Sequence, residues 1–403
     1  MRRLRRPAAW LVGATLLVSA CAGRIVPPIG AGGQPFEPET DERALWARAE
    51  KEEEALLKKA RRYDDLQLEE YLARIAERLP PDQARAAGGP GFKIAVLRDP
   101  TLSAFAMPNG SVFVHTGLLS RLDNEAQLAT ILGHETTHVI HRHALIAERK
   151  GVSAEEVTGA TVLGPTAKVI LGLGLQLAAV ASIDGYGRDL EAEADDGGLA
   201  SVVRAGYDPK EAPKAFDRLR SDSRDRGSLE TFLLGNERNL SERAATVREL
   251  VATRYAAAAA APATVRDSEE FQLRMRTVVR DNAYEDVRAG RFTLAQRQLD
   301  RVLAVTPQDP LAHLYYGDLH RLQAQRTRDV AEKARSADRA LAAYERAAAL
   351  DPVLAEPYRQ LGFLYYEQKQ NARAREAFAK YLALKPDAAD ARRIKEYLAE
   401  LDR

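Results

Sequence analysis

Hydrophobic residues recur at helical spacing along most of the chain and at strand spacing over one short stretch. Helical periodicity covers residues 41–79, 124–150 and 189–205. Strand-like alternation covers residues 92–97, 103–107 and 111–115, and Pro108-Asn109-Gly110 predicts a hairpin between the last two. Asn124 is a suitable N-cap for the second helix, with Gln127 at its third position, and Gly151 is a suitable stop. The pattern predicts an α+β fold that is mostly helical, with a small β-sheet.

The hydrophobic pattern becomes repetitive in the last third of the chain. Small, aromatic and proline residues recur at an offset of 34 residues, with Ala340, Tyr344, Ala347 and Pro352 matched by Ala374, Phe378, Tyr381 and Pro386. A looser copy precedes them, and the middle unit carries about 11 extra residues around 326–338. Gly317 and Gly362 lie where the first helix of a unit would pack closest to its partner. This helix–turn–helix unit resembles the tetratricopeptide repeat, and the regular offset disfavours a plain helical bundle.

The N-terminus has the layout of a secretory signal peptide. Arginines at positions 2, 3, 5 and 6 precede an apolar run over residues 8–20. The run ends in Val18-Ser19-Ala20-Cys21, which resembles the lipobox of bacterial lipoproteins. We therefore predict lipidation of Cys21 and a membrane anchor, and Ala22 favours the periplasmic face of the outer membrane. The alternatives are an incidental thiol on an uncleaved anchor and a cytoplasmic enzyme without this signal.

Composition narrows the function further. The net charge of +1 falls below zero once the arginine-rich leader is removed, so no basic excess remains to bind a nucleic acid. A single cysteine excludes an internal disulfide. The apolar run at 169–181 is too short to cross a membrane and predicts a buried or lid-like helix. The predicted organisation is a signal peptide (1–20), a flexible tether (21–40), a catalytic domain (41–255), a linker (256–268) and an all-α repeat domain (269–403).

Five residues carry the clearest chemistry: His134-Glu135-Thr136-Thr137-His138. Residues i and i+4 of a helix share one face, so both imidazoles can bind one Zn²⁺, and Glu135 can take a proton from a metal-bound water. A catalytic zinc site needs a third protein ligand. Glu191 and Asp195 share one face of the third helix, so one can bind the metal while the other orients a histidine.

The runs Leu132–Val139 and Arg188–Asp195, with Ala104–Gly110 upstream, resemble the HtpX/BepA group of zinc metallopeptidases, to which the CAAX prenyl proteases also belong. The resemblance covers roughly residues 60–250. It implies a zincin-type domain with one zinc per chain, Glu191 as third ligand and Asp195 behind the ligands. Envelope members of the group join this domain to tetratricopeptide repeats.

The function that we predict is a zinc-dependent metalloendopeptidase with Glu135 as general base. Its expected substrates are unfolded or misassembled envelope proteins, lying extended against 111–115 as an edge strand, while the repeats recruit a substrate or partner. The alternative is a largely non-proteolytic scaffold or chaperone.

Several further residues are predicted to affect regulation or substrate contact. The group usually carries a His-Pro pair near the site, and here Glu237 stands in the place of that histidine. Glu237 could act as a regulatory ligand and Arg238 could stabilise an oxyanion, although simple divergence of this loop is the alternative. His115 and Asn109 are candidate substrate contacts, with a solvated strand end as the alternative for His115. His141 and His143 are interpreted as packing or supporting residues.

Overall fold

A three-stranded sheet supports the functional part of the molecule, which is described here from a computed structural model. The model describes residues 26–151, 165–181, 186–225, 237–262 and 264–402. The strands are β1 (Lys93–Leu97), β2 (Ala104–Ala106) and β3 (Ser111–His115), in the order β1-β3-β2. β3 pairs in parallel with β1 and antiparallel with β2. The predicted hairpin and the α+β, mostly helical class are confirmed.

The position of β3 corrects one expectation. Residues 111–115 form the central strand, so they cannot be the edge to which a substrate adds. The edge strand next to the histidine helix is β2. Its ladder bonds to β3 come from Ser103 and Met107, so the main-chain groups of Ala104 and Ala106 point away from β3, toward the outer edge of the sheet. The sequence could not rank the strands because a hairpin pattern fixes which strands pair, not what pairs with their other sides.

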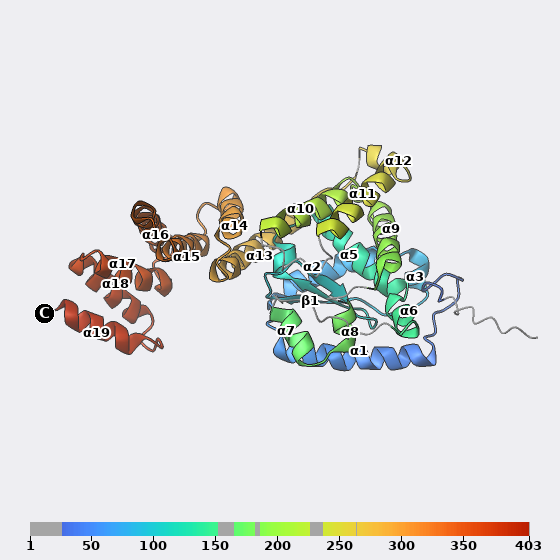
Figure 1. Cartoon of the computed structure of the whole chain (residues 1–403), viewed down its shortest axis with the longest axis horizontal. Coiled ribbons are helices and arrows are strands. Elements are labelled where there is room, and N and C mark those ends of the chain that lie inside the picture. Colours follow the sequence, from blue (N-terminus) through green and yellow to red (C-terminus); the bar gives the residue numbers. More distant parts are fainter. Residues whose placement is uncertain (1–25, 152–164, 182–185, 226–236, 263, 403) are drawn as a thin grey trace, which may run out of the picture.

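Helices surround the sheet and build the body on the right of Figure 1. They are α1 (Thr40–Lys59), α2 (Leu66–Arg78), α3 (Asp82–Ala86), α4 (Thr116–Leu119), α5 (Glu125–Ile140), α6 (His143–Arg149), α7 (Pro165–Gly172), α8 (Gln176–Ala179), α9 (Arg188–Arg204), α10 (Glu211–Asp225), α11 (Glu237–Ala252) and α12 (Ala256–Ala260). α5 and α9 approach closely because glycines meet at their crossing. A Cβ added at Gly198 would lie 2.8 Å from the backbone nitrogen of His134.

Two predicted helices are interrupted. Residues 41–79 form α1 and α2, separated by a segment in which the Tyr63 amide donates to the Val96 carbonyl at 2.9 Å. Residues 124–150 form α5 and α6, separated at Arg142, which adopts a left-handed conformation with φ of 59°. Its guanidinium is buried against Glu42, with Nε donating to Oε1 at 2.9 Å. The hydrophobic pattern around Arg142 cannot reveal this ion pair, because its partner Glu42 lies 100 residues away. Asn124 does cap α5, accepting from the Gln127 amide at 3.0 Å.

The described part of the predicted tether is bound to the body rather than free. The Ile29 amide donates to the Ile140 carbonyl at 2.8 Å, and the Phe36 amide donates to the Ala87 carbonyl at 2.7 Å. Gly30 has a φ of 82°, and an added Cβ would lie 2.6 Å from the Gln83 carbonyl oxygen. A flexible tether up to residue 40 is therefore not what the structure shows. The predicted signal peptide and Cys21 lie outside the described residues.

The apolar segment after residue 164 forms the short helices α7 and α8, which pack against α1. Glu52 of α1 accepts hydrogen bonds from the Leu177 and Ala178 amides at 3.2 and 3.0 Å, at the start of α8. Among the described residues, no helix has both the length and the apolar character needed to span a membrane. Residues 152–164 and 182–185, on either side of this segment, lie outside the described residues.

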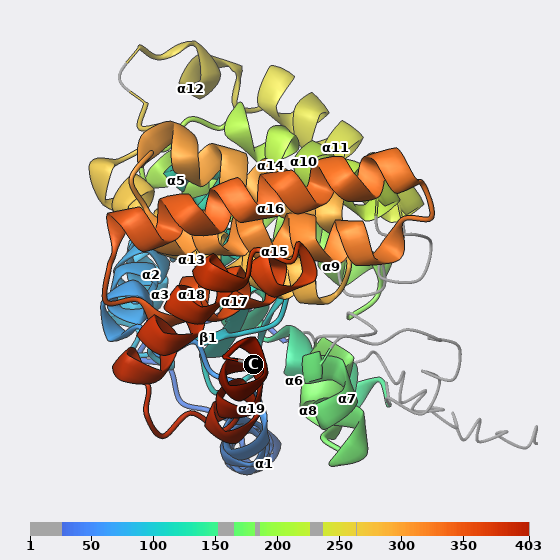
Figure 2. The same ribbon diagram turned by 90° about the vertical axis from the view of Figure 1, so that its left-hand side faces the viewer.

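The remaining helices form an elongated array that leaves the body on one side (Figures 1 and 2). They are α13 (Glu269–Arg288), α14 (Phe292–Val305), α15 (Pro310–Arg326), α16 (Val330–Leu350), α17 (Ala355–Glu367), α18 (Asn371–Leu384) and α19 (Ala391–Leu401). Gly317 of α15 faces the ring of Tyr344, and Gly362 of α17 faces Phe378. The predicted role of both glycines is confirmed. The extra residues of the middle unit lengthen the helix pair, since α16 spans 21 residues.

The first helices of the array share a core with the body. Apolar side chains of α13, α14 and α15 belong to the same buried cluster as those of α2, α5 and the sheet. A buried ion pair joins the two parts, with Arg121 Nη2 2.9 Å from Asp286 Oδ2. Part of the segment 256–268 is helical as α12, and its role as a linker stays a prediction.

A methyl group at Gly317 should destabilise the repeats. The added Cβ would lie 2.4 Å from ring carbons of Tyr344, so Gly317→Ala is expected to lower the free energy of unfolding by about 1–3 kcal/mol. Thermal and urea unfolding followed by circular dichroism would measure the change. Gly172→Ala is the control, because an added Cβ there meets no described atom within 4 Å. Equal stability of the two variants would contradict this packing.

Candidate metal centre

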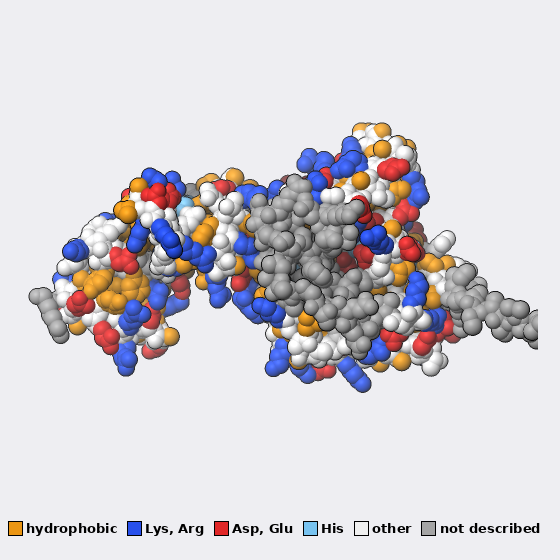
Figure 3. Space-filling model, viewed as in Figure 1, with side chains coloured by type: hydrophobic (Ala, Val, Ile, Leu, Met, Phe, Trp, Pro, Cys, Tyr) orange, Lys and Arg blue, Asp and Glu red, His pale blue; other side chains and the backbone are white. Residues whose placement is uncertain are grey.

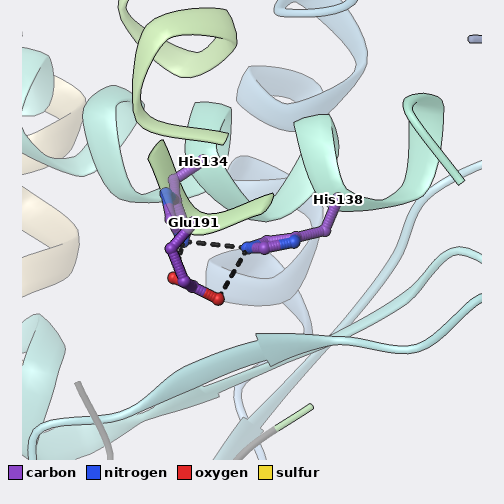
Figure 4. Close-up of side chains that lie close together, drawn as sticks. All are labelled: His134, His138 and Glu191. Atoms are coloured by element: carbon purple, nitrogen blue, oxygen red, sulfur yellow. Dashed lines mark hydrogen bonds and ion pairs between the residues drawn. The ribbon is translucent and has the colours of Figure 1, made fainter. Parts of the chain in front are cut away.

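Two imidazoles and one carboxylate converge where α5 crosses α9. The ligand atoms of His134, His138 and Glu191 all lie within 4.8 Å of one another. His134 Nε2 is 3.0 Å from His138 Nε2 and 3.4 Å from Glu191 Oε2, and His138 Nε2 is 3.7 Å from Glu191 Oε1. Figure 4 shows the three side chains pointing at a common point above the sheet. The sequence left Glu191 and Asp195 as alternatives for this place, and Glu191 occupies it.

The donor set fits a transition metal. Zn–N and Zn–O bonds of about 2.0–2.1 Å in a tetrahedral site require donor atoms roughly 3.3 Å apart. The three observed separations lie on both sides of this value. Two neutral nitrogens and one carboxylate are also the three-ligand set that leaves a fourth position open. The residues present therefore suit zinc without rearrangement of the backbone.

Asp195 lies behind His134 and orients it. Its Oδ1 is 2.9 Å from His134 Nδ1, on the ring edge away from the converging Nε2 atoms. Arg243 of α11 holds this carboxylate from the other side, with Nε 2.9 Å from Oδ2 and Nη2 2.8 Å from Oδ1. Burial opposes the charge of Asp195, but the Arg243 guanidinium outweighs it and lowers the pKa to about 2. A fixed carboxylate places the histidine proton on Nδ1 and leaves Nε2 for a ligand.

The metal-free site favours a positive charge at His134. Burial and Arg243 disfavour protonation of the ring, yet the hydrogen bonds to Asp195 and Glu191 prevail and raise the pKa of His134 to about 9. Burial alone would raise the pKa of Glu191, but His134 and His138 outweigh it and hold this pKa far below its usual range. Because a ligating imidazole must be free of a proton at its donor nitrogen, metal binding at this group releases a proton.

The His138 side chain contacts Tyr186 and His143. The ring of Tyr186 lies against it with centroids 4.8 Å apart, and His143 Nδ1 is 2.8 Å from His138 Nδ1. Burial keeps both histidines neutral, lowering the pKa of His138 well below its usual value and that of His143 to about 4. A supporting role for His143 agrees with this contact.

The side chain of Glu135 extends from α5 to the edge strand β2. Its side chain is buried, and it accepts a hydrogen bond from the Ala106 backbone of β2. Burial raises the pKa of Glu135 to about 7, although His134 and Arg243 oppose the shift. A carboxyl group with a pKa near the working pH can both accept and return a proton.

Other predicted site residues lie elsewhere. His115 is buried, with Nδ1 2.8 Å from Thr101 Oγ1 and 3.9 Å from Asp99 Oδ1, so the solvated strand end is wrong, and the contact with substrate stays a prediction. Asn109 donates to Glu53 of α1 at 2.8 Å and holds the hairpin turn, and its contact with substrate stays a prediction. Glu237 and Arg238 begin α11, but their side chains lie outside the description.

Arg243 and Tyr186 are the site residues that sequence reasoning missed. Neither belongs to the metal-binding motif, and Arg243 is 48 residues from its partner. One signal was present. A buried carboxylate behind a ligating histidine needs a counter-charge, and the helix after residue 237 is rich in arginine. Periodicity alone could not select which arginine supplies it.

One helix bears both histidines and the buried glutamate, a facing helix bears the carboxylate, and a strand edge runs beside them. This is the arrangement of the zincin-type metallopeptidases. Comparison with family models agrees, because residues 66–266 match Peptidase family M48 and residues 328–399 match the tetratricopeptide repeat. The chain belongs to peptidase family M48 through this domain and continues into tetratricopeptide repeats, so both resemblances are confirmed.

Similar proteins come from bacteria and mitochondria. The putative beta-barrel assembly-enhancing protease of Vibrio cholerae is 31% identical over 40% of this chain and 34% of its own length. The beta-barrel assembly-enhancing protease of Escherichia coli is 28% identical over 45% of this chain and 38% of its own. The mitochondrial metalloendopeptidase OMA1 of Arabidopsis thaliana is 31% identical over 32% and 26%. The chain thus spans well under half the length of these relatives.

Loss of Arg243 should weaken metal binding without removing a ligand. Arg243→Ala leaves the buried Asp195 carboxylate without its counter-charge, so Asp195 holds the His134 ring less firmly, and we expect a roughly 10–100-fold lower metal affinity, on the order seen for residues that support a ligand. Competition with a chromogenic chelator would measure it. Arg248→Ala on the same helix, which removes an exposed pair with Asp217, is the matched control. Unchanged affinity in Arg243→Ala would show that the ion pair does not position the site.

Proposed function

We propose that this chain is a zinc-dependent metalloendopeptidase that binds one zinc ion at His134, His138 and Glu191. The observation that carries the proposal is the convergence of these three donors beside a buried glutamate and the edge strand β2. Asp195 and Arg243 support the ligands, and Glu135 is the general base. Membership of family M48 and the printed names of the relatives support a metal-dependent peptidase.

Zinc, when bound, would supply a Lewis acid that activates water and polarises the scissile carbonyl. The chain's own residues then govern the proton. Glu135 takes it from the attacking water onto its carboxylate and returns it to the amine of the leaving segment. Burial raises the pKa of Glu135 to about 7, so this side chain can both accept and release a proton near neutral pH.

The free edge of β2 is the proposed binding surface for an extended substrate. Main-chain groups of Ala104 and Ala106 would pair with the substrate backbone, as in other strand additions. The Ala106 carbonyl now accepts from the Tyr186 hydroxyl at 3.4 Å and the Ala106 amide donates to Glu135, so a substrate strand would displace both side chains from this residue. Pairing through the backbone depends little on sequence, which suits unfolded chains as substrates.

The repeats are proposed to recruit unfolded or misassembled envelope proteins, or a partner that presents them. Hydrophobic side chains gather over α17–α19 in Figure 3. The partly buried aromatic side chains that pack on the core of these helices are Tyr358, Phe363, Tyr366 and Tyr397. The names of the bacterial relatives support a role in envelope assembly. Lipidation of Cys21 and a place on the periplasmic face of the outer membrane complete the proposal.

Glu135→Gln should abolish most proteolysis while leaving the metal in place. Loss of the general base is expected to lower kcat by about 10²–10⁴-fold on an unfolded protein such as casein. Zinc content by atomic spectroscopy should be unchanged, because Glu135 is not among the converging donors. Glu148→Gln, an exposed glutamate of α6 paired with Arg48, is the control. Cleavage by Glu135→Gln at the wild-type rate would refute the mechanism.

A truncation separates recruitment from catalysis. Because α13–α15 share the core of the body and α15 packs on α16, the deletion should remove only residues 355–403. We expect kcat/KM to fall for an unfolded protein and to stay unchanged for a short peptide. A wild-type cell phenotype in Glu135→Gln together with its loss on truncation would favour the scaffold alternative.

A further inference from the structure

A second group of metal-binding side chains lies beside the first. The ligand atoms of His141, His143 and Glu193 also fall within 4.8 Å of one another. His141 Nδ1 is 2.5 Å from Glu193 Oε1, and His143 Nε2 is 3.7 Å from Glu193 Oε2. The donors are again two imidazoles and one carboxylate. As in the first group, the histidines belong to the α5–α6 segment and the carboxylate belongs to α9.

The break at Arg142 creates this group. Two residues apart on a continuous helix, side chains point about 200° apart, so His141 and His143 could not face one carboxylate. The left-handed conformation of Arg142 ends α5 and restarts the chain as α6, which turns both rings toward Glu193. The break is fixed from outside by Glu42 and by the Pro27 carbonyl, which accepts from Arg142 Nη1 at 3.3 Å.

One donor atom of this group is buried and unused. The His143 side chain is 0% exposed, and among the described residues its Nε2 has no hydrogen-bond partner. An orphaned buried ring nitrogen is unfavourable unless a ligand completes it. His141 and Glu193 are 25% and 45% exposed, so an ion could enter and leave from the solvent side.

We propose that His141, His143 and Glu193 form a second, exchangeable site for a divalent metal of the zinc class. Imidazole nitrogens with a carboxylate select zinc and its neighbours over magnesium or calcium. This proposal rests on the proposed function only in taking the first group as the primary zinc site.

Contact and exposure make the second site the weaker one. His143 Nδ1 lies 2.8 Å from His138 Nδ1, so ions at the two groups would be close neighbours, and adjacent cations repel. His141 and Glu193 are more exposed than His138 and Glu191, so solvent screens their attraction for a cation more, and the first group should fill first.

Equilibrium dialysis of the untagged full chain against zinc, with metal counted by atomic spectroscopy, tests the proposal. The wild-type chain should bind two ions, the second at least about tenfold more weakly than the first, as expected from the repulsion between adjacent cations. His141→Gln and Glu193→Gln should each bind one ion, at unchanged affinity for the first. His313→Gln, which alters an exposed repeat histidine bonded to the Pro307 carbonyl, should still bind two.

Two outcomes would overturn the second site: a wild-type chain that saturates at one ion, or two ions retained in both His141→Gln and Glu193→Gln. The primary site is tested separately by His134→Gln, which should lose the tight ion and keep the weaker one. If His134→Gln retains the tight ion while the other variants behave as expected, the proposed function fails and the second site stands. Circular dichroism of each variant confirms that the fold is intact.

Discussion

The buried pair of Asp195 and Arg243 is the interaction on which the metal centre depends. A carboxylate removed from water is costly unless a cation and hydrogen bonds compensate for the lost hydration. The fork of Arg243 does this with two bonds, and Asp195 can then hold the His134 ring at a fixed tautomer. The pair also joins three helices, since His134 lies on α5, Asp195 on α9 and Arg243 on α11. The same hydrogen bonds therefore orient the His134 ring and hold α5, α9 and α11 together.

Local patterns in the sequence predicted much of this arrangement. The His134–His138 spacing requires only a helix, and the Asn124 cap and the hydrophobic period both indicate one. The glycines at 317 and 362 likewise follow from a repeat whose small residues face aromatic ones. These features depend on residues within one or two turns, or on a fixed repeat length, so the chain itself carries the information.

What the sequence could not predict comes from contacts between distant segments. Nothing near Arg142 signals a break, because the break is stabilised by Glu42, 100 residues away. The central place of β3 depends on its parallel pairing with β1, and the choice of Arg243 depends on how α11 crosses α9. The prolines and glycines at 27–36 predict a flexible tether, because both residues are common in flexible chains. Glycine also permits a close approach of two backbones, and this is its role at Gly30.

The shared core of α13–α15 and the body has a geometrical consequence. Because α13–α15 share a buried core with the sheet, the distance from this part of the array to the metal centre is set by the packing of helices, although the segment that links the body to α13 is largely exposed. If α17–α19 recruit substrates as proposed, a polypeptide held there would need a free segment long enough to reach β2. The length of that free segment and its lack of folded structure would then select what is cut, in addition to any preference at the cleavage point.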